Sequence, residues 1–174
     1  IKKYLFRDEI DVSTDPWNNN HRQKMFYQFN IFPEVVSIKG PKFVFAHVLA
    51  PHDPFVVNKN CEPIPESEVK KHNHVYNYLE QIQCVNVNME KIVDQIQKGS
   101  KTPPIIIIQA DEGPFPMKKQ IDSKQSWSKA TNAQLAEKFP IINAYYLPSS
   151  SASADLYPSI SPVNSFKVVF NNYF

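Results

Sequence analysis

The clearest pattern of apolar positions in the chain lies in its middle. Apolar side chains recur there at steps of three and four residues, at Val75, Leu79, Ile82, Val85, Met89, Ile92 or Val93, and Ile96. This spacing places side chains on one face of an α-helix. Gly99 follows the last of them, and glycine commonly comes directly after the end of a helix. The pattern predicts an amphipathic helix of about six turns.

Two apolar runs on either side of this helix are typical of buried strands. Residues 42–49, KFVFAHVL, are β-branched and aromatic and lie between prolines, which is the composition of a strand. Residues 103–111, PPIIIIQAD, are too short for a typical helix and apolar on both faces, as in the centre of a parallel sheet. Strand, helix and strand in this order predict a right-handed crossover unit.

Weaker patterns extend this α/β prediction to the rest of the chain. We expect a further strand at 140–148 and short helices at 21–32, at 131–139 with Thr131 as the cap, and from Pro162 onward. Loops or turns are expected at 51–68, 116–131 and 149–155. Residues 1–20 are polar and turn-rich, and we predict a connecting segment there, followed by one α/β region at 21–174.

The composition of the chain argues against several classes of function. The 174 residues carry a net charge of +2 and no run of Lys or Arg longer than two, so a nucleic-acid partner is not expected. Three isolated glycines exclude a phosphate-binding glycine-rich loop. No apolar segment approaches the roughly 18 residues of a membrane span. The chain begins with Ile and ends in an apolar pattern, so we expect a segment of a longer protein.

The two cysteines leave two alternatives open. Cys61 and Cys84 do not have the spacing of a metal finger, and a disulfide between them is one alternative. The other alternative is a small buried thiol at Cys84, which lies beside the apolar positions of the predicted helix. The spacing does not decide between them, so the redox compartment stays open.

Titratable side chains follow both predicted strands. Asp111 and Glu112 end the second, and His47, His52 and Asp53 lie at or just beyond the end of the first. Ligands of open α/β sheets bind where the carboxyl ends of strands meet. The group would suit a divalent ion such as Zn²⁺ or Mn²⁺, or its histidines could carry protons or donate to an anion. A simple turn at Asp111 and a core histidine at His47 are the structural alternatives.

Several blocks of the sequence resemble a known family. The chain is similar to the carboxyl-terminal part of sulfatase-like proteins of the alkaline phosphatase superfamily, and more narrowly to the extracytoplasmic domain of membrane-anchored bacterial members. The resemblance covers 22–174 and is carried by KFVFAHVLAPHDPF, YLEQIQCVNVNMEKIVDQI, PPIIIIQADEGPFP, INAYYLP and LYPSISPVNSFKVVFNNYF. It implies an alkaline-phosphatase-like layered sandwich, a mostly parallel sheet flanked by helices, of which this chain is the later part.

The resemblance also implies roles for individual residues. The family has a late Asp-His-Gly motif that binds metal, and Asp111-Glu112-Gly113 stands at that position, with Glu112 in place of the histidine. Asp111 and Glu112 are therefore the expected metal ligands, for Mn²⁺, Zn²⁺, Mg²⁺ or Ca²⁺. A family histidine contacts the anionic group of the substrate, and His52 matches it, with His47 as second choice.

The resemblance implies one function and leaves a second open. The first is part of a metal-dependent hydrolase or transferase of a sulfate or phosphate ester of an envelope molecule. It would act at the extracytoplasmic face of the membrane and be anchored through segments outside this chain. No block here resembles the family's nucleophile segment, so we expect no catalytic residue in this fragment and no activity from it alone. The second is a non-catalytic domain that binds an envelope glycan, a lipid head group or a protein.

Overall fold

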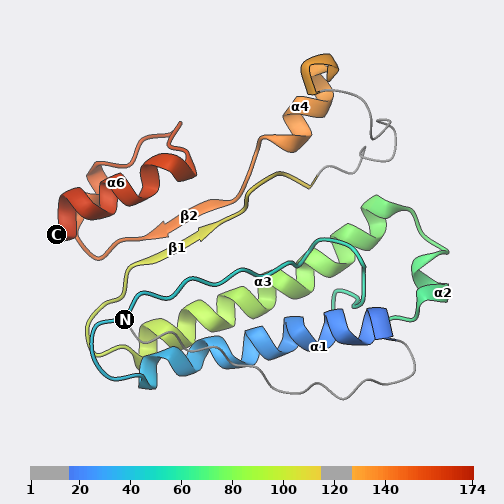
Figure 1. Ribbon diagram of the computed structural model, residues 1–174, viewed down its shortest axis with the longest axis horizontal. Coiled ribbons are helices and arrows are strands. Elements are labelled where there is room, and N and C mark those ends of the chain that lie inside the picture. Colours follow the sequence, from blue (N-terminus) through green and yellow to red (C-terminus); the bar gives the residue numbers. More distant parts are fainter. Residues whose placement is uncertain (1–15, 115–126) are drawn as a thin grey trace. The chain divides into compact units, whose positions relative to one another are not determined.

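The computed structural model describes residues 16–114 and 127–174 (Figure 1). The chain divides into two compact units, Ile1–Ile92 and Val93–Phe174, and each is described by itself. Among the described residues, no helix combines the length and the apolar character needed to cross a membrane. Part of the connecting segment predicted at 1–20 and most of the loop predicted at 116–131 lie outside the described residues.

Helices dominate the first unit. α1 spans Pro16–Ile31 and begins inside the predicted connecting segment, and the 3₁₀ helix η1, Phe32–Ser37, follows it with Pro33 in its first turn. α2 is a single turn, Glu66–Val69. α3, His74–Gly99, confirms the predicted long helix and continues into the second unit.

The buried face of α3 agrees with the predicted one at Val85 and Ile92 and differs from it in the first turns of the helix. Val75 and Leu79 are exposed, whereas the buried positions include the polar residues Asn77 and Gln81. The reason is hydrogen bonding: the Asn77 side chain donates to the Val69 carbonyl (2.9 Å), and Gln81 bonds the loop that precedes α2. Paired polar groups can be buried at little cost, so apolar periodicity alone did not identify these two buried positions.

The prediction of a strand at 42–49 is wrong. No strand forms there, and Phe45 is 81% exposed. Within the first unit the predicted loop contributes to the core beside α1 and α3: Phe55 is 6% exposed and Val56 and Val57 are fully buried. A strand needs a partner to accept its hydrogen bonds, and no described segment pairs with 42–49.

A two-stranded sheet lies in the second unit. β1, Ile106–Gln109, and β2, Asn143–Tyr146, confirm two predicted strands, but they pair antiparallel, with Ile106 opposite Tyr146 and Gln109 opposite Asn143. The predicted parallel crossover is therefore not seen in the described residues, which form this one sheet and no layered sandwich. β1 is half-buried rather than central.

Short helices follow the strands of this unit. They are η3 (Trp127–Lys129), α4 (Asn132–Lys138), α5 (Ser150–Ala154) and α6 (Pro162–Tyr173). The predicted cap of α4 is confirmed: the Thr131 hydroxyl accepts from the Gln134 amide (3.3 Å), and the Gln134 side chain accepts from the Thr131 amide (2.8 Å). The turn predicted at 149–155 is instead α5, because Ala152 is buried against α6 and Leu147.

Candidate functional site

Asp111 and Glu112 lie directly after β1, as predicted. Both side chains are exposed and line an open groove of about 750 Å³ in the second unit. The opposite sides of the groove come from the end of α4, from β2 and from the segment before α6, with Lys138, Phe139, Asn143, Tyr145 and Tyr157 among its lining residues. The groove therefore combines two carboxylates, one ammonium group and aromatic rings.

Glu112 has a cationic partner. The Lys138 ammonium, at the last residue of α4, donates to the Glu112 carboxylate, and only 20% of the Lys138 side chain is exposed. The Gly113 amide also donates to the Lys138 carbonyl (2.6 Å). The acidic pair is thus attached to the end of α4 by a side-chain contact and by a backbone contact.

The described residues do not make a metal site at this groove. Within 16–114 and 127–174, no group of three His, Cys, Asp or Glu side chains could hold a metal ion. The charge of Glu112 is balanced by Lys138, and a cation would have to displace this ammonium. Asp111 makes no hydrogen bond or ion pair with a residue that the structure describes, so its carboxylate is the one open to a ligand.

A polar network behind the groove was not found from the sequence. The Gln109 amide donates to the Asn143 side chain (2.6 Å) and to the buried Ser165 hydroxyl (2.5 Å). Tyr145 hydroxyl lies 2.7 Å from Ser165 Oγ, and the Asn143 amide donates to the Ile160 carbonyl (3.0 Å). The signal that could have indicated this network is a polar residue inside each of two apolar runs, Gln109 and Asn143. The network holds two groove-lining side chains, Asn143 and Tyr145, in place.

His52 lies in the first unit, on the loop between 42–49 and the buried Phe55. Its imidazole is 59% exposed, and Nδ1 lies 2.8 Å from Oδ1 and 2.6 Å from the carbonyl oxygen of Asp53. The backbone beneath it is bound to α3: the fully buried Gln81 donates to the carbonyls of Pro51 (3.3 Å) and His52 (3.2 Å) and accepts from the Val56 amide (2.8 Å). The loop thus presents the ring to solvent from a fixed backbone.

His21 of α1 is a residue that the sequence did not single out. Burial lowers the pKa of His21, the positive charges of His52 and Lys24 lower it further, and the Asp53 carboxylate opposes them. Its Nε2 atom is buried and has no hydrogen-bond partner among the described residues. These effects require Lys24, His52 and Asp53 to lie within electrostatic range of His21.

His47 is not the core histidine that its apolar surroundings suggested. It is exposed, and its carbonyl accepts from the Gln28 amide (2.8 Å). His47 and His52 belong to the first unit, and Asp111 and Glu112 belong to the second. A single cluster of all four therefore stays a prediction.

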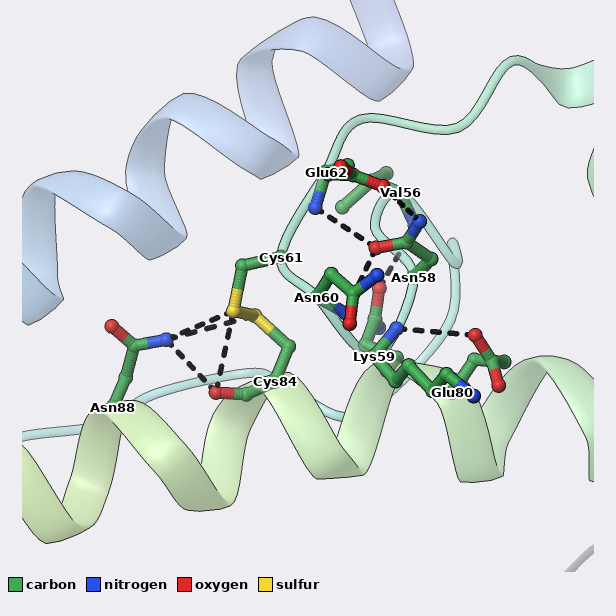
Figure 2. The surroundings of a disulfide bond; sticks show 10 residues. Val56, Asn58, Lys59, Asn60, Cys61, Glu62, Glu80, Cys84 and Asn88 are labelled. Carbon is green, nitrogen blue, oxygen red and sulfur yellow. Dashed lines mark hydrogen bonds between the residues drawn. A yellow bond between two sulfur atoms is a disulfide. The ribbon is translucent and has the colours of Figure 1, made fainter.

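The two cysteines form a disulfide. Cys61 and Cys84 are bonded with an S–S distance of 2.06 Å, which decides between the two alternatives left open by the sequence. Figure 2 shows Asn88 beside the bond, where its amide donates to the Cys84 carbonyl (2.8 Å). Asn58 accepts from the amides of Asn60 and Glu62 (3.0 Å each) and closes the turn that carries Cys61. The loop after His52 is thereby linked covalently to α3.

Comparison with known proteins identifies the family. A family model described as Sulfatase matches residues 5–141, more than three quarters of the chain. The chain belongs to the sulfatase family, and it is therefore a sulfatase-like protein of the alkaline phosphatase superfamily. A search of curated proteins and a search of solved structures found no significant match.

Proposed function

We propose that the chain is a portion of a sulfatase-like hydrolase or transferase that acts on a sulfate or phosphate ester. The observation that carries this proposal is the family match over residues 5–141. Both substrate classes present a tetrahedral anion, and the protein must balance the negative charge of this group while it is transferred.

His52 is the residue that we propose for contact with the anion. Its exposed ring lies on a backbone fixed by Gln81, and Lys24 adds positive charge in the surroundings of the neighbouring His21. His47 is the second choice, and it is also exposed. A fixed imidazole that can donate a hydrogen bond is a common way to hold an anionic group.

Metal dependence is part of the proposal and rests on family membership. Of the two carboxylates that line the groove, Asp111 is the one without an ion pair to a described residue, and Glu112 would have to leave Lys138 before it could assist. The two carboxylates alone are too few for the ions expected here, since Mn²⁺, Zn²⁺, Mg²⁺ and Ca²⁺ take four or more ligands. Further ligands would have to come from other parts of the protein.

The ester substrate belongs, in our proposal, to an envelope molecule outside the cytoplasmic membrane. The Cys61–Cys84 disulfide supports this location, because cysteine pairs of this kind form and persist in oxidising compartments. We also propose that these 174 residues alone do not carry out the reaction, since no segment resembles the family's nucleophile block.

The ion pair between Glu112 and Lys138 favours a second function. An ammonium group that already balances this carboxylate reduces the need for a metal ion at the groove. In that case the chain would be a non-catalytic sulfatase-like domain, and its open groove with Tyr145 and Tyr157 would bind an envelope glycan, a lipid head group or a protein.

Titration with Mn²⁺ tests the metal-dependent function against the non-catalytic one. In the full-length protein, which can supply the further ligands, we expect calorimetry to detect Mn²⁺ binding to the wild type and a loss of at least about tenfold in affinity for Asp111→Ala, equivalent to about 1.4 kcal/mol. Asp94→Ala is the matched control, because Asp94 is an exposed carboxylate paired with Lys98 on α3. Equal affinity in Asp111→Ala and in the control would contradict the assignment of Asp111 and favour the non-catalytic domain.

A further inference from the structure

We propose that Asp53 is a positioning residue, which fixes the proton of His52 on Nδ1 and makes Nε2 the atom that meets the ligand. The ligand class, a sulfate or phosphate ester, rests on the proposed function. The position of the proton follows from the contacts of the imidazole and is independent of that function.

Two oxygen atoms of one residue determine the tautomer. His52 Nδ1 lies 2.8 Å from Asp53 Oδ1 and 2.6 Å from the Asp53 carbonyl oxygen. An ionised carboxylate and a backbone carbonyl accept hydrogen bonds and cannot donate them. Nδ1 must therefore carry a proton. A neutral imidazole has one N–H group, so its Nε2 carries the lone pair.

The backbone of this loop is held on α3 at two points. Gln81 is fully buried and bonds the carbonyls of Pro51 and His52 and the amide of Val56. Three residues further along α3, Cys84 is joined to Cys61. Residues three apart lie on the same face of a helix. Asp53 and Gln81 together therefore restrain both the ring and its backbone, and they leave the far edge of the imidazole exposed.

The fixed tautomer makes contact with an anion depend on pH. In the neutral ring, Nε2 presents a lone pair and repels the oxygen of a sulfate group. In the protonated ring, Nε2–H can donate to that oxygen while Nδ1–H stays bound to Asp53. The charged or titratable groups around the ring are Asp53, in direct contact with it, and His21 of α1, which is itself in electrostatic range of Lys24. Gln81 faces the loop from α3 without charge.

Nitrogen-15 NMR of the histidine side chains tests the positioning role. With the His52 resonances assigned from the His52→Gln spectrum, we expect the neutral ring of the wild type to be protonated on Nδ1. In Asp53→Ala the carboxylate acceptor is lost and only the backbone carbonyl of residue 53 remains, so we expect the fraction of rings protonated on Nδ1 to fall and a mixture of the two tautomers to form. Asp94→Ala should keep the wild-type pattern. Asp53 is exposed, so its replacement leaves the core intact.

Two outcomes would overturn the inference. One is an Nε2-protonated neutral ring in the wild type, and the other is the same tautomer ratio in Asp53→Ala as in the wild type.

Titration with inorganic sulfate separates this inference from the proposed function. We expect His52 resonances to move with sulfate where the ring is protonated, and the affinity to fall about tenfold or more once the ring is neutral, since one charge-assisted hydrogen bond is lost. Suppose that the neutral ring is protonated on Nδ1, but that sulfate binds neither to the protonated nor to the neutral form. This outcome would support the positioning role of Asp53 and contradict the anion role of His52.

Discussion

Gly113 shows how a single residue without a side chain determines where the acidic pair lies. A Cβ atom at this position would lie 2.8 Å from the Pro140 carbonyl oxygen and 2.9 Å from that of Lys138, closer than side chains approach backbone oxygen atoms. The backbone contact between Gly113 and Lys138 at 2.6 Å is possible because this Cβ is absent. The end of β1 and the end of α4 can therefore meet only around a glycine.

We expect Gly113→Ala to lower the free energy of unfolding by about 1–3 kcal/mol, the range of overpacked buried sites. The methyl group would push against backbone oxygen atoms, which cannot rotate away as a flexible side chain can. Urea denaturation measures the change. A variant as stable as the wild type would contradict this account of the glycine.

Gly40→Ala is the informative comparison. A Cβ atom at Gly40 would meet no atom within 4 Å, but its φ of +84° is unfavourable for a residue with a side chain. We expect a cost of about 1 kcal/mol from backbone strain alone. The comparison separates the effect of crowding from the effect of backbone conformation.

At the level of elements, the positions of two phenylalanines distinguish the predicted core of the first unit from the observed one. Phe45 belongs to the run predicted as a buried strand and is 81% exposed, whereas Phe55 belongs to the predicted loop and is 6% exposed. Phe55 also packs edge-on against His74, with ring centroids 5.0 Å apart. Part of the apolar surface buried in this unit therefore comes from the loop bound to α3, where no strand was predicted.

We expect Phe55→Ala to cost about 3–5 kcal/mol of stability, as for other buried aromatic side chains. Phe45→Ala should change stability by no more than about 0.5 kcal/mol, because an exposed side chain loses little on truncation. Thermal unfolding of both variants is the measurement. Equal losses in the two would show that 42–49 is packed in the folded chain.

The same comparison shows what the sequence can predict. Local patterns identified α3, both strands and α4 with its cap, because apolar spacing, bounding prolines and a capping residue act within one segment. The direction of strand pairing and the buried face of α3 depend on partners distant in sequence. Gln81, for example, is buried because it bonds backbone groups more than twenty residues away.

Prediction of the candidate site was also limited by contacts between residues distant in sequence. The position of Asp111 and Glu112 after a strand was predicted, and so was the loop with His52. Lys138 was not, because it is 26 residues from Glu112 and lies in a segment whose pattern indicated only a helix. The role of Asp53 was missed because its contact with His52 requires atomic positions.

At the level of the whole molecule, the disulfide is the one covalent link between distant segments. It closes a loop between residues 23 positions apart, and a loop of that size restricts the unfolded chain by about 3 kcal/mol in the chain-entropy model. The link lies in the first unit, on the side of α3 that also carries Gln81. Its effect on stability should therefore be largest for the loop that presents His52.

We expect a reducing agent to lower the denaturation midpoint of the wild type, with a loss of about 3 kcal/mol at full reduction. The double variant Cys61→Ala and Cys84→Ala is the control, because it has no bond to reduce. Its midpoint should not respond to the reducing agent. A wild type with the same midpoint in both conditions would show that the disulfide does not form in solution.

The attachment of the acidic pair to α4 has a mechanical consequence. Glu112 binds the Lys138 ammonium and Gly113 binds the Lys138 carbonyl, so the two residues that follow Asp111 are both fastened to one residue. A ligand that pulls Asp111 into the groove would transmit its displacement to the last turn of α4 and to the exposed ring of Phe139. Occupancy at the carboxylate would thereby become a movement of a helix end, which a second molecule at that surface could detect.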